Sequence, residues 1–192
     1  MKRIILVLSC LMFYSSCLTK QEKKINLKIM SYNIRHGEGI DTILNVSRSA
    51  EIIKSYAPDL CALQEVDNFC LRSDSIGQTE YLAKQTEMTG TFGGFMNFQG
   101  GEYGMATLSL KPLISTNILQ LPDGKYEPRT SIVHEVQLSK EDTILFANVH
   151  FDWISGEEGD INRLNQAKAL TEYINSLNKA AIITGDFNCT PN

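Results

Sequence analysis

Residues 180–188, Ala-Ala-Ile-Ile-Thr-Gly-Asp-Phe-Asn, join a short apolar run to a carboxylate and an amide. A short apolar run bounded by a glycine predicts a buried strand. Residues 59–66, Asp-Leu-Cys-Ala-Leu-Gln-Glu-Val, repeat the pattern earlier in the chain, with Glu65 as the carboxylate expected at the strand end. Two such strands predict a β-rich core that carries polar side chains at one edge.

The remaining patterns fill in the same architecture. Strand-like runs occur at residues 25–34, 91–99, 103–110, 113–121, 131–138 and 144–151. Apolar residues at helical spacing predict helices at 46–57 and 162–177, with a shorter helix at 80–88. Because strands outnumber helices and helices flank them, we expect an α/β sandwich of the α+β class, with two packed, mostly antiparallel sheets in four layers.

Length and charge limit the classes of function. With 192 residues, 43% hydrophobic and 21% charged, the chain is long enough for one globular domain with a core. Its formal net charge is −4. Proteins that bind nucleic acid without sequence preference usually carry a basic surplus. The charge therefore argues against a standing polyanionic partner, although a local basic cleft would be compatible with it.

The N-terminal residues have the pattern of an export signal. Lys2 and Arg3 precede an apolar run that reaches Tyr14, and small residues lead from there to Cys17. The run is shorter than the roughly 20 apolar residues that span a bilayer, so we expect a cleaved signal at residues 1–17 and a tether at 18–24. The ending resembles a bacterial lipobox with Cys17 as the acylated residue, although Tyr14 departs from the usual Leu, Val or Ile.

This pattern predicts an exported lipoprotein, anchored to a membrane of the bacterial cell envelope through Cys17. Simple secretion and an uncleaved N-terminal anchor are the alternatives. Beyond the signal, the cysteines are Cys61, Cys70 and Cys189, an odd number without a Cys-x-x-Cys pair. Neither a disulfide framework nor a zinc cluster is indicated.

Polar residues able to do chemistry recur at the ends of the predicted strands: Asn33, Glu65, His150, Asp186 and Asn188. Rigid scaffolds place sites on the loops that follow strand ends. Convergence of the five on one edge would give a pocket of carboxylates and amides with one imidazole. Taken one at a time, each residue is better explained as a strand-end cap or turn residue.

Four motifs, in this order, favour a shared site over separate turn residues. They are Ser-Tyr-Asn-Ile-Arg at 31–35, Leu-Gln-Glu-Val-Asp at 63–67, Asn-Val-His-Phe-Asp at 148–152 and Gly-Asp-Phe-Asn at 185–188. Weaker agreements are Leu-Arg-Ser at 71–73, Tyr-Gly-Met-Ala-Thr-Leu-Ser at 103–109 and Pro-Arg at 128–129. Together they resemble the endonuclease/exonuclease/phosphatase superfamily from about Leu27 to the last residue. We therefore expect residues 25–192 to form a domain of that kind.

The resemblance implies a divalent metal, Mg²⁺ or Mn²⁺, held by Glu65 with help from Asn33. Such hard ions suit oxygen ligands and keep several waters, and they offset charge developing on a phosphoryl group. His150 would donate a hydrogen bond to a non-bridging phosphate oxygen.

The other implied roles concern water and phosphate. Asp186 would orient or deprotonate the attacking water, and Asn188 would fix that water or the phosphate. Arg129 is a candidate phosphate clamp because its guanidinium matches phosphate geometry, with an ordinary surface arginine as the alternative. Asp152 is expected in a loop near the pocket, and His134 in strand packing. His36 lies in the first catalytic loop and either approaches substrate or has no role.

One family element is missing from these residues. Members of the superfamily carry a Ser-Asp-His element several dozen residues after Gly-Asp-Phe-Asn, whereas the sequence ends at Thr190-Pro191-Asn192. We therefore expect a C-terminally truncated domain whose second half is incomplete. Loss of one general acid or base costs about 10²–10⁴-fold in rate, so this chain alone is expected to be inactive.

The resulting hypothesis is a metal-dependent hydrolase that cleaves phosphodiester or phosphomonoester bonds with an activated water. Nucleic acid, phospholipid headgroups and sugar or inositol phosphates are all open as substrates, with a nuclease disfavoured by the charge. The alternative is a non-catalytic surface lipoprotein that uses the scaffold to bind a ligand or partner. A serine hydrolase is excluded because the chain has no Gly-x-Ser-x-Gly motif.

Overall fold

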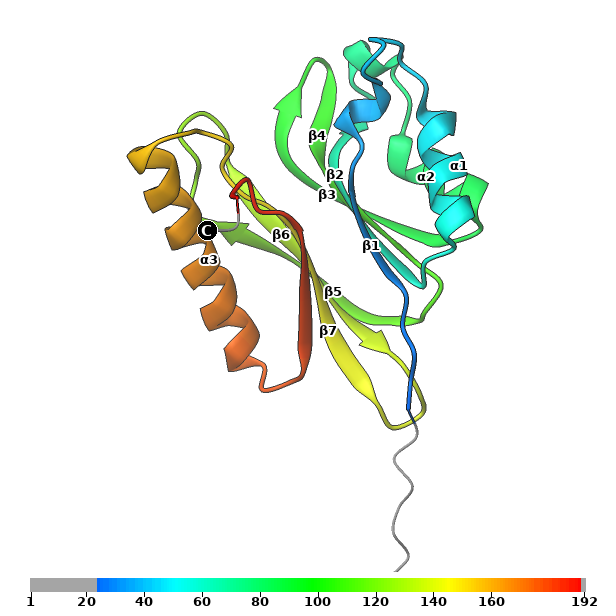
Figure 1. Cartoon of the computed structure of the whole chain (residues 1–192), viewed down its shortest axis with the longest axis vertical. Coiled ribbons are helices and arrows are strands. Elements are labelled where there is room, and N and C mark those ends of the chain that lie inside the picture. Colours follow the sequence, from blue (N-terminus) through cyan, green and yellow to red (C-terminus); the bar gives the residue numbers. More distant parts are fainter. Residues whose placement is uncertain (1–23, 191–192) are drawn as a thin grey trace, which may run out of the picture.

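The computed structural model describes residues 24–190, which form two four-stranded sheets packed face to face, with helices on both outer sides (Figure 1). The predicted signal at 1–17, the lipidation site Cys17 and all but the last residue of the tether lie outside the described residues. Among the helices of residues 24–190, none is long and apolar enough to cross a membrane.

The first sheet has the order β1-β2-β4-β3, built from β1 (Ile29–Asn33), β2 (Leu60–Asn68), β3 (Thr89–Phe98) and β4 (Gly101–Ser109). The second has the order β5-β6-β7-β8, built from β5 (Leu113–Leu121), β6 (Arg129–Gln137), β7 (Thr143–His150) and β8 (Ala181–Asp186). The pairs β1–β2 and β7–β8 are parallel, and all other pairs are antiparallel. The α/β sandwich with mostly antiparallel pairing is confirmed.

Three helices cover the outer faces: α1 (Val46–Tyr56) and α2 (Gln78–Thr86) on the first sheet, and α3 (Glu157–Ser176) on the second (Figure 1). Single 3₁₀ turns, η1 (Arg35–Gly37) and η2 (Leu71–Ser73), follow β1 and β2. α1 begins where the Asn45 side chain accepts a hydrogen bond from the Ser47 amide, a standard N-cap. The predicted four layers are therefore present.

Each contact between layers has its own apolar cluster. Ile53 of α1 and Leu82 of α2 pack with Leu63 of β2 in one cluster, and Leu170 of α3 packs with Val149 of β7 in another. Leu60, Ala62, Val136 and Phe146 fill the space between the two sheets. Strands β2, β6 and β7 contribute to two clusters each, because successive side chains of a strand point to opposite faces of its sheet.

A buried amide network joins the two sheets beside these strands. Asn148 of β7 donates to the carbonyl oxygens of Leu63 and Ala106 at 3.1 and 2.8 Å, and accepts from Gln64 Nε2 at 2.8 Å. Asn148 and Gln64 are both buried, so these bonds form away from water. Satisfied buried networks fix a unique packing arrangement, and here they set the register of one sheet against the other.

Several predicted boundaries were wrong by two residues or more, and three of them have a clear physical reason. β1 begins at Ile29 instead of residue 25, because pairing starts where its partner β2 starts, at Leu60. α3 begins at Glu157 instead of residue 162, and its acidic first turn suits the positive end of a helix dipole. β2 does not end at Gln64-Glu65 but continues to Asn68, with Glu65 as an extra residue in a bulge.

Candidate active site

Glu65 reaches the site from a bulge inside β2. Gln64 pairs with Met105 and Val66 with Gly104, so Glu65 has no partner of its own across the ladder. Its backbone has φ of 56°, a left-handed conformation that costs a non-glycine residue about 1–2 kcal/mol. Bulges of this kind re-aim a side chain next to functional sites. The bulge turns the carboxylate towards the edge where β1 and β8 lie.

Asn33 connects the two sheets at that edge. It is the last residue of β1, and its Nδ2 donates to Glu65 Oε1 at 2.8 Å and to Asp186 Oδ2 at 3.1 Å. Asp186 is the last residue of β8, 153 positions along the chain. One amide therefore gathers two carboxylates from different sheets into a single cluster.

Asp186 and Asn188 are positioned by the turn after β8. Asp186 Oδ1 accepts from the Asn188 amide at 3.0 Å, and Asn188 Nδ2 donates to the Phe151 carbonyl at 2.9 Å. A Cβ on Gly185 would lie 2.0 Å from the Val149 carbonyl oxygen, so this position needs a glycine. The motif Gly-Asp-Phe-Asn therefore combines a close strand approach with a turn that presents both polar groups.

His150, the last residue of β7, lies beside this cluster with a neutral ring. Its Nε2 is 4.0 Å from Asp186 Oδ2, too far for a hydrogen bond, and its buried Nδ1 has no hydrogen-bond partner. Burial and, next, the charge of Arg129 lower its pKa to about 4, although Asp186 and Glu65 oppose the shift. At neutral pH the imidazole therefore holds a single proton and has unused hydrogen-bonding capacity.

Arg129 is buried, so the alternative of a surface arginine was wrong. Its Nη2 lies 2.8 Å from Glu127 Oε2, and its guanidinium carbon lies 5.3 Å from the centre of the Phe95 ring. The ion pair with Glu127 offsets part of its charge, whereas Nε and Nη1 have no hydrogen-bond partner among the described residues. A buried guanidinium with donors left over is suited to bind an anion such as phosphate.

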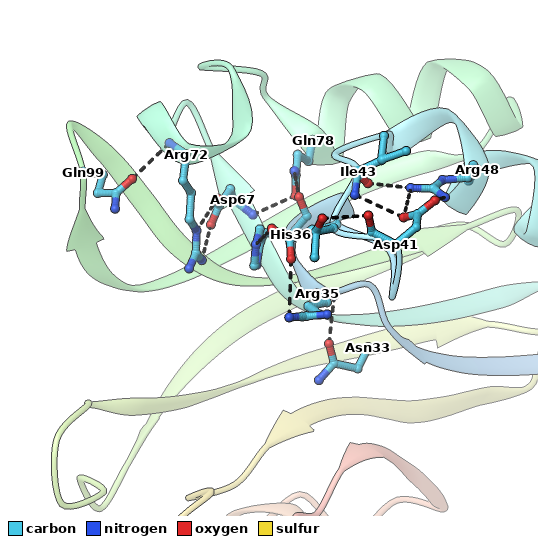
Figure 2. Close-up of polar contacts among 12 residues, drawn as sticks. Asn33, Arg35, His36, Asp41, Ile43, Arg48, Asp67, Arg72, Gln78 and Gln99 are labelled. Carbon is cyan, nitrogen blue, oxygen red and sulfur yellow. Dashed lines mark hydrogen bonds and ion pairs between the residues drawn. The ribbon is translucent and has the colours of Figure 1, made fainter.

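The loop after Asn33 is held by a second polar network (Figure 2). Asn33 Oδ1 accepts a hydrogen bond from the Arg35 amide at 3.0 Å. Gln78 Nε2 donates to the His36 carbonyl oxygen at 2.6 Å, and Gln78 Oε1 accepts from the Asp67 amide at 3.0 Å. Asp67 in turn receives two hydrogen bonds of 2.8 Å from Arg72. These contacts fix β1, β2 and α2 against each other where Asn33 and Glu65 leave the sheet.

The other residues singled out in the sequence make contacts outside the Asn33, Glu65 and Asp186 cluster. Burial and then Arg72 lower the pKa of His36, whose Nε2 is 3.7 Å from Glu38. His134 is fully buried on β6 and contacts Thr116 at 2.8 Å, in agreement with strand packing. Asp152 is buried in the loop after β7, where it accepts hydrogen bonds from Lys125 and Asn162.

Sequence reasoning gave no role to the supporting amides Gln64, Gln78 and Asn148. Gln64 and Asn148 are carboxamides within buried apolar strands, which is the signal that could have identified them, whereas Gln78 opens α2 without such a signal. It also missed Tyr103, a largely buried residue of β4 whose pKa is raised by burial and by the nearby charge of Glu65.

The chemistry of this cluster fits a divalent cation. Within residues 24–190 there is no group of three or more His, Cys, Asp or Glu side chains arranged to hold a metal. Two carboxylates and one amide are nevertheless the kind of donor set that Mg²⁺ uses, because this ion keeps several waters and takes further oxygens from a substrate phosphate. An open cleft of about 740 Å³ adjoins the cluster, with Asn33, Asp186 and Asn188 in its lining.

Comparison with known proteins gives a consistent answer. The model of the Endonuclease/Exonuclease/phosphatase family matches residues 30–192. No curated protein sequence matches the chain.

Solved structures share the fold at low sequence identity. An endonuclease/exonuclease/phosphatase from Beutenbergia cavernae superposes with a TM-score of 0.71 at 17% identity, covering 86% of this chain and 48% of that one. The human Nocturnin catalytic domain, with a bound sulfate anion, superposes with a TM-score of 0.69 at 20% identity, and the match covers 88% of this chain and 66% of that one. Bacteroides thetaiotaomicron mannosyl-6-phosphatase superposes with a TM-score of 0.65 at 20% identity, and the match covers 86% of this chain and 67% of that one. The chain thus spans about half to two thirds of their lengths.

Proposed function

The chain belongs to the endonuclease/exonuclease/phosphatase family, and we propose that it carries the metal-binding half of a phosphoesterase active site. The observation that carries the proposal is the Asn33 amide that joins Glu65 of one sheet to Asp186 of the other. Two carboxylates held together without a cation repel each other. A divalent ion at Glu65 and Asn33 would relieve this repulsion and offset the charge of a bound phosphate.

The remaining residues of the site have separate roles in hydrolysis. Asp186 accepts a proton from the attacking water, whose oxygen forms a new bond to phosphorus while the bond to the leaving oxygen breaks. His150 donates its one ring proton to a non-bridging oxygen, and Arg129, whose Nε and Nη1 have no partner among the described residues, adds a positively charged contact. Asn188 holds the water or the phosphate. The leaving oxygen takes its proton from solvent or from a group outside these residues.

Activity assays on the full-length protein test this assignment. We expect hydrolysis of p-nitrophenyl phosphate or bis-p-nitrophenyl phosphate with Mg²⁺ or Mn²⁺, and loss of activity with a chelator. Replacement of Asp186 by Asn should lower kcat by about 10²–10⁴-fold. The exposed Glu51 of α1 offers a control, because Glu51→Gln changes the same charge far from the cleft. Hydrolysis that survives chelation and Asp186→Asn would refute the proposal.

Metal binding is tested separately by thermal unfolding. A ligand that binds only the native state at 100 times its Kd stabilises it by about 2.7 kcal/mol. We expect Mg²⁺ to raise Tm in the wild type and in Glu51→Gln, but not in Glu65→Ala. A metal response without turnover of any phosphate ester would favour the alternative of a binding protein on the same scaffold.

We also propose export and lipidation at Cys17, on the strength of the N-terminal pattern alone. Labelling cells with a radioactive fatty acid should mark the wild-type protein and leave Cys17→Ser unlabelled. Recovery of unlabelled wild-type protein from the cytoplasm would contradict both parts of this proposal.

A further inference from the structure

Two large aromatic side chains stand exposed in the loops that lead to Arg129 and away from His150. Tyr126 is 69% exposed and Trp153 is 55% exposed, although both are residues that proteins usually bury in large part. Their ring centres lie 6.2 Å apart with the planes tilted by 35°. The two rings therefore adjoin each other, and both are largely exposed to solvent.

The positions of these rings in the chain place them close to the phosphate-binding residues. Trp153 follows His150 by three positions, and Tyr126 precedes Arg129 by three. Three residues span no more than about 11 Å even when fully extended. A ring attached to a phosphate at His150 and Arg129 is therefore within reach of the two aromatic faces.

A buried carboxylate holds the two loops together. Asp152 Oδ2 accepts hydrogen bonds from the Lys125 amide at 3.3 Å and from Asn162 Nδ2 at 2.8 Å. The Asp152 amide donates to Gln166 Oε1 at 2.9 Å, and Gln166 Nε2 donates to the Pro122 carbonyl at 3.0 Å. The loop before β6 and the loop after β7 are thus tied to α3, which keeps the rings in place before any ligand arrives.

The charges around the rings favour an uncharged partner. Asp123, Glu127, Glu157 and Glu158 lie in the same two loops or at the start of α3. The one lysine there, Lys125, is 2.6 Å from Glu158 and 5.5 Å from the centre of the Tyr126 ring. An acidic rim of this kind repels a polyanion but leaves the stacking of a neutral ring unaffected.

We propose that Tyr126 and Trp153 form a stacking subsite for an uncharged ring in the leaving group of a small phosphate ester. The ring can belong to a sugar or to a nucleoside, since both present a flat face to an aromatic side chain. The subsite deepens the phosphoesterase assignment and rests on it for the position of the phosphate. It gives Asp152 the role of a positioning residue, acting through the two loops.

Trp153 itself provides a direct binding signal, because it is the only tryptophan of the 192 residues. Its emission is measured while the chain is titrated with a hexose 6-phosphate, a nucleoside 5′-monophosphate or glycerol phosphate. We expect saturable quenching by at least one ring-bearing ester, with a Kd at least about tenfold below that of the acyclic ester, and weaker binding in Tyr126→Ala. Equal binding of all three, or no quenching, would overturn the subsite.

Turnover by the full-length protein gives the second test. Stacking of one ring is worth about a fivefold to 150-fold change in affinity. Trp153→Ala should therefore lower the ratio of kcat/KM for the ring-bearing ester to that for glycerol phosphate by this factor, mainly through KM. Trp153→Phe should restore most of it. The matched control is Tyr56→Ala on α1, whose ring is 65% exposed at a distant position.

The two proposals fail in different ways. Binding of a ring-bearing ester to Trp153 without hydrolysis would refute the phosphoesterase assignment and support the subsite. Hydrolysis with an unchanged ratio in Trp153→Ala would support the assignment and refute the subsite. Preference for the hexose or for the nucleoside ester identifies the source of the ring.

Discussion

Strands β2 and β8 have similar sequences but differ in burial and in the way each presents its carboxylate. Each is an apolar run that carries a carboxylate, and the two carboxylates meet at the Asn33 amide. β2 is an inner strand that is buried along almost its whole length, whereas β8 is an edge strand within residues 24–190 and stays partly exposed. Glu65 leaves β2 through a bulge in its interior, and Asp186 is the terminal residue of β8.

The difference shows where each strand can tolerate a distortion. β2 is clamped between α1, α2 and the other sheet, so packing on both faces compensates for the left-handed backbone of Glu65. Among the strands of residues 24–190, β8 pairs with β7 alone, and it reaches close contact through Gly185 instead. Strain at the inner strand and a glycine at the edge strand thus serve the same purpose, which is to aim a carboxylate at the cleft.

Truncation of one side chain on each strand tests this comparison with the largest expected effect. Leu63 of β2 is fully buried, so Leu63→Ala should lower the free energy of unfolding by about 2–5 kcal/mol. Ile183 of β8 is 37% exposed, and Ile183→Ala should cost about 1 kcal/mol. Urea unfolding of both variants measures the difference. Equal losses would show that β8 is packed as tightly as β2.

Substitution of Gly185 tests the close approach of β8 to β7. A Cβ there would meet the Val149 carbonyl oxygen at 2.0 Å, so Gly185→Ala should destabilise the fold by about 3 kcal/mol. Gly156 is the control, because it also has a positive φ, 84°, but a Cβ there would meet nothing within 4 Å. Gly156→Ala should cost only about 1 kcal/mol. Similar unfolding midpoints for the two variants would argue against the clash.

Acid should lower the free energy of unfolding through the buried imidazole of His134 in the sheet that contains β8. Burial lowers the pKa of His134 from 6.5 to about 4, so the unfolded chain binds a proton more readily than the folded one. Stability is therefore complete above about pH 6.5 and falls as the pH drops towards 4. Between pH 7.5 and pH 5 this one group should cost about 2 kcal/mol.

The contribution of His134 is isolated by comparison with His134→Gln. Urea unfolding at pH 7.5 and pH 5 should show a smaller acid-induced loss in the variant, by about 2 kcal/mol. Other titrating groups cancel in this difference. An identical loss in both proteins would show that His134 is protonated in the folded state at pH 5.

The smallest expected effect concerns the bulge in β2. Glu65→Ala and Glu65→Gly both remove the hydrogen bond from Asn33, but only glycine adopts a φ of 56° without strain. Glu65→Gly should therefore be more stable than Glu65→Ala by about 1 kcal/mol. Thermal unfolding without added metal measures the difference. If alanine were equally stable, the bulge would store no strain.

Much of the fold was predictable because its signals are local. Apolar and helical periodicity placed every strand and helix within a few residues, since the spacing of apolar side chains determines which face is buried. The site was predictable in part. Asn33, Glu65 and Asp186 do converge, and His150 lies beside them, as strand ends in one family pattern suggested. Metal binding and lipidation of Cys17 stay predictions.

Local patterns of residues were enough to identify the elements, the order of the four motifs and the kinds of chemistry they carry. The bulge at Glu65, the burial of Arg129 and the contact between Tyr126 and Trp153 emerged only from the packed fold. These three features depend on contacts between residues that are far apart in the chain. Periodicity along one strand fixes its own faces, whereas bulges, burial of charge and loop contacts depend on how two sheets and α3 pack over separations that no local pattern encodes.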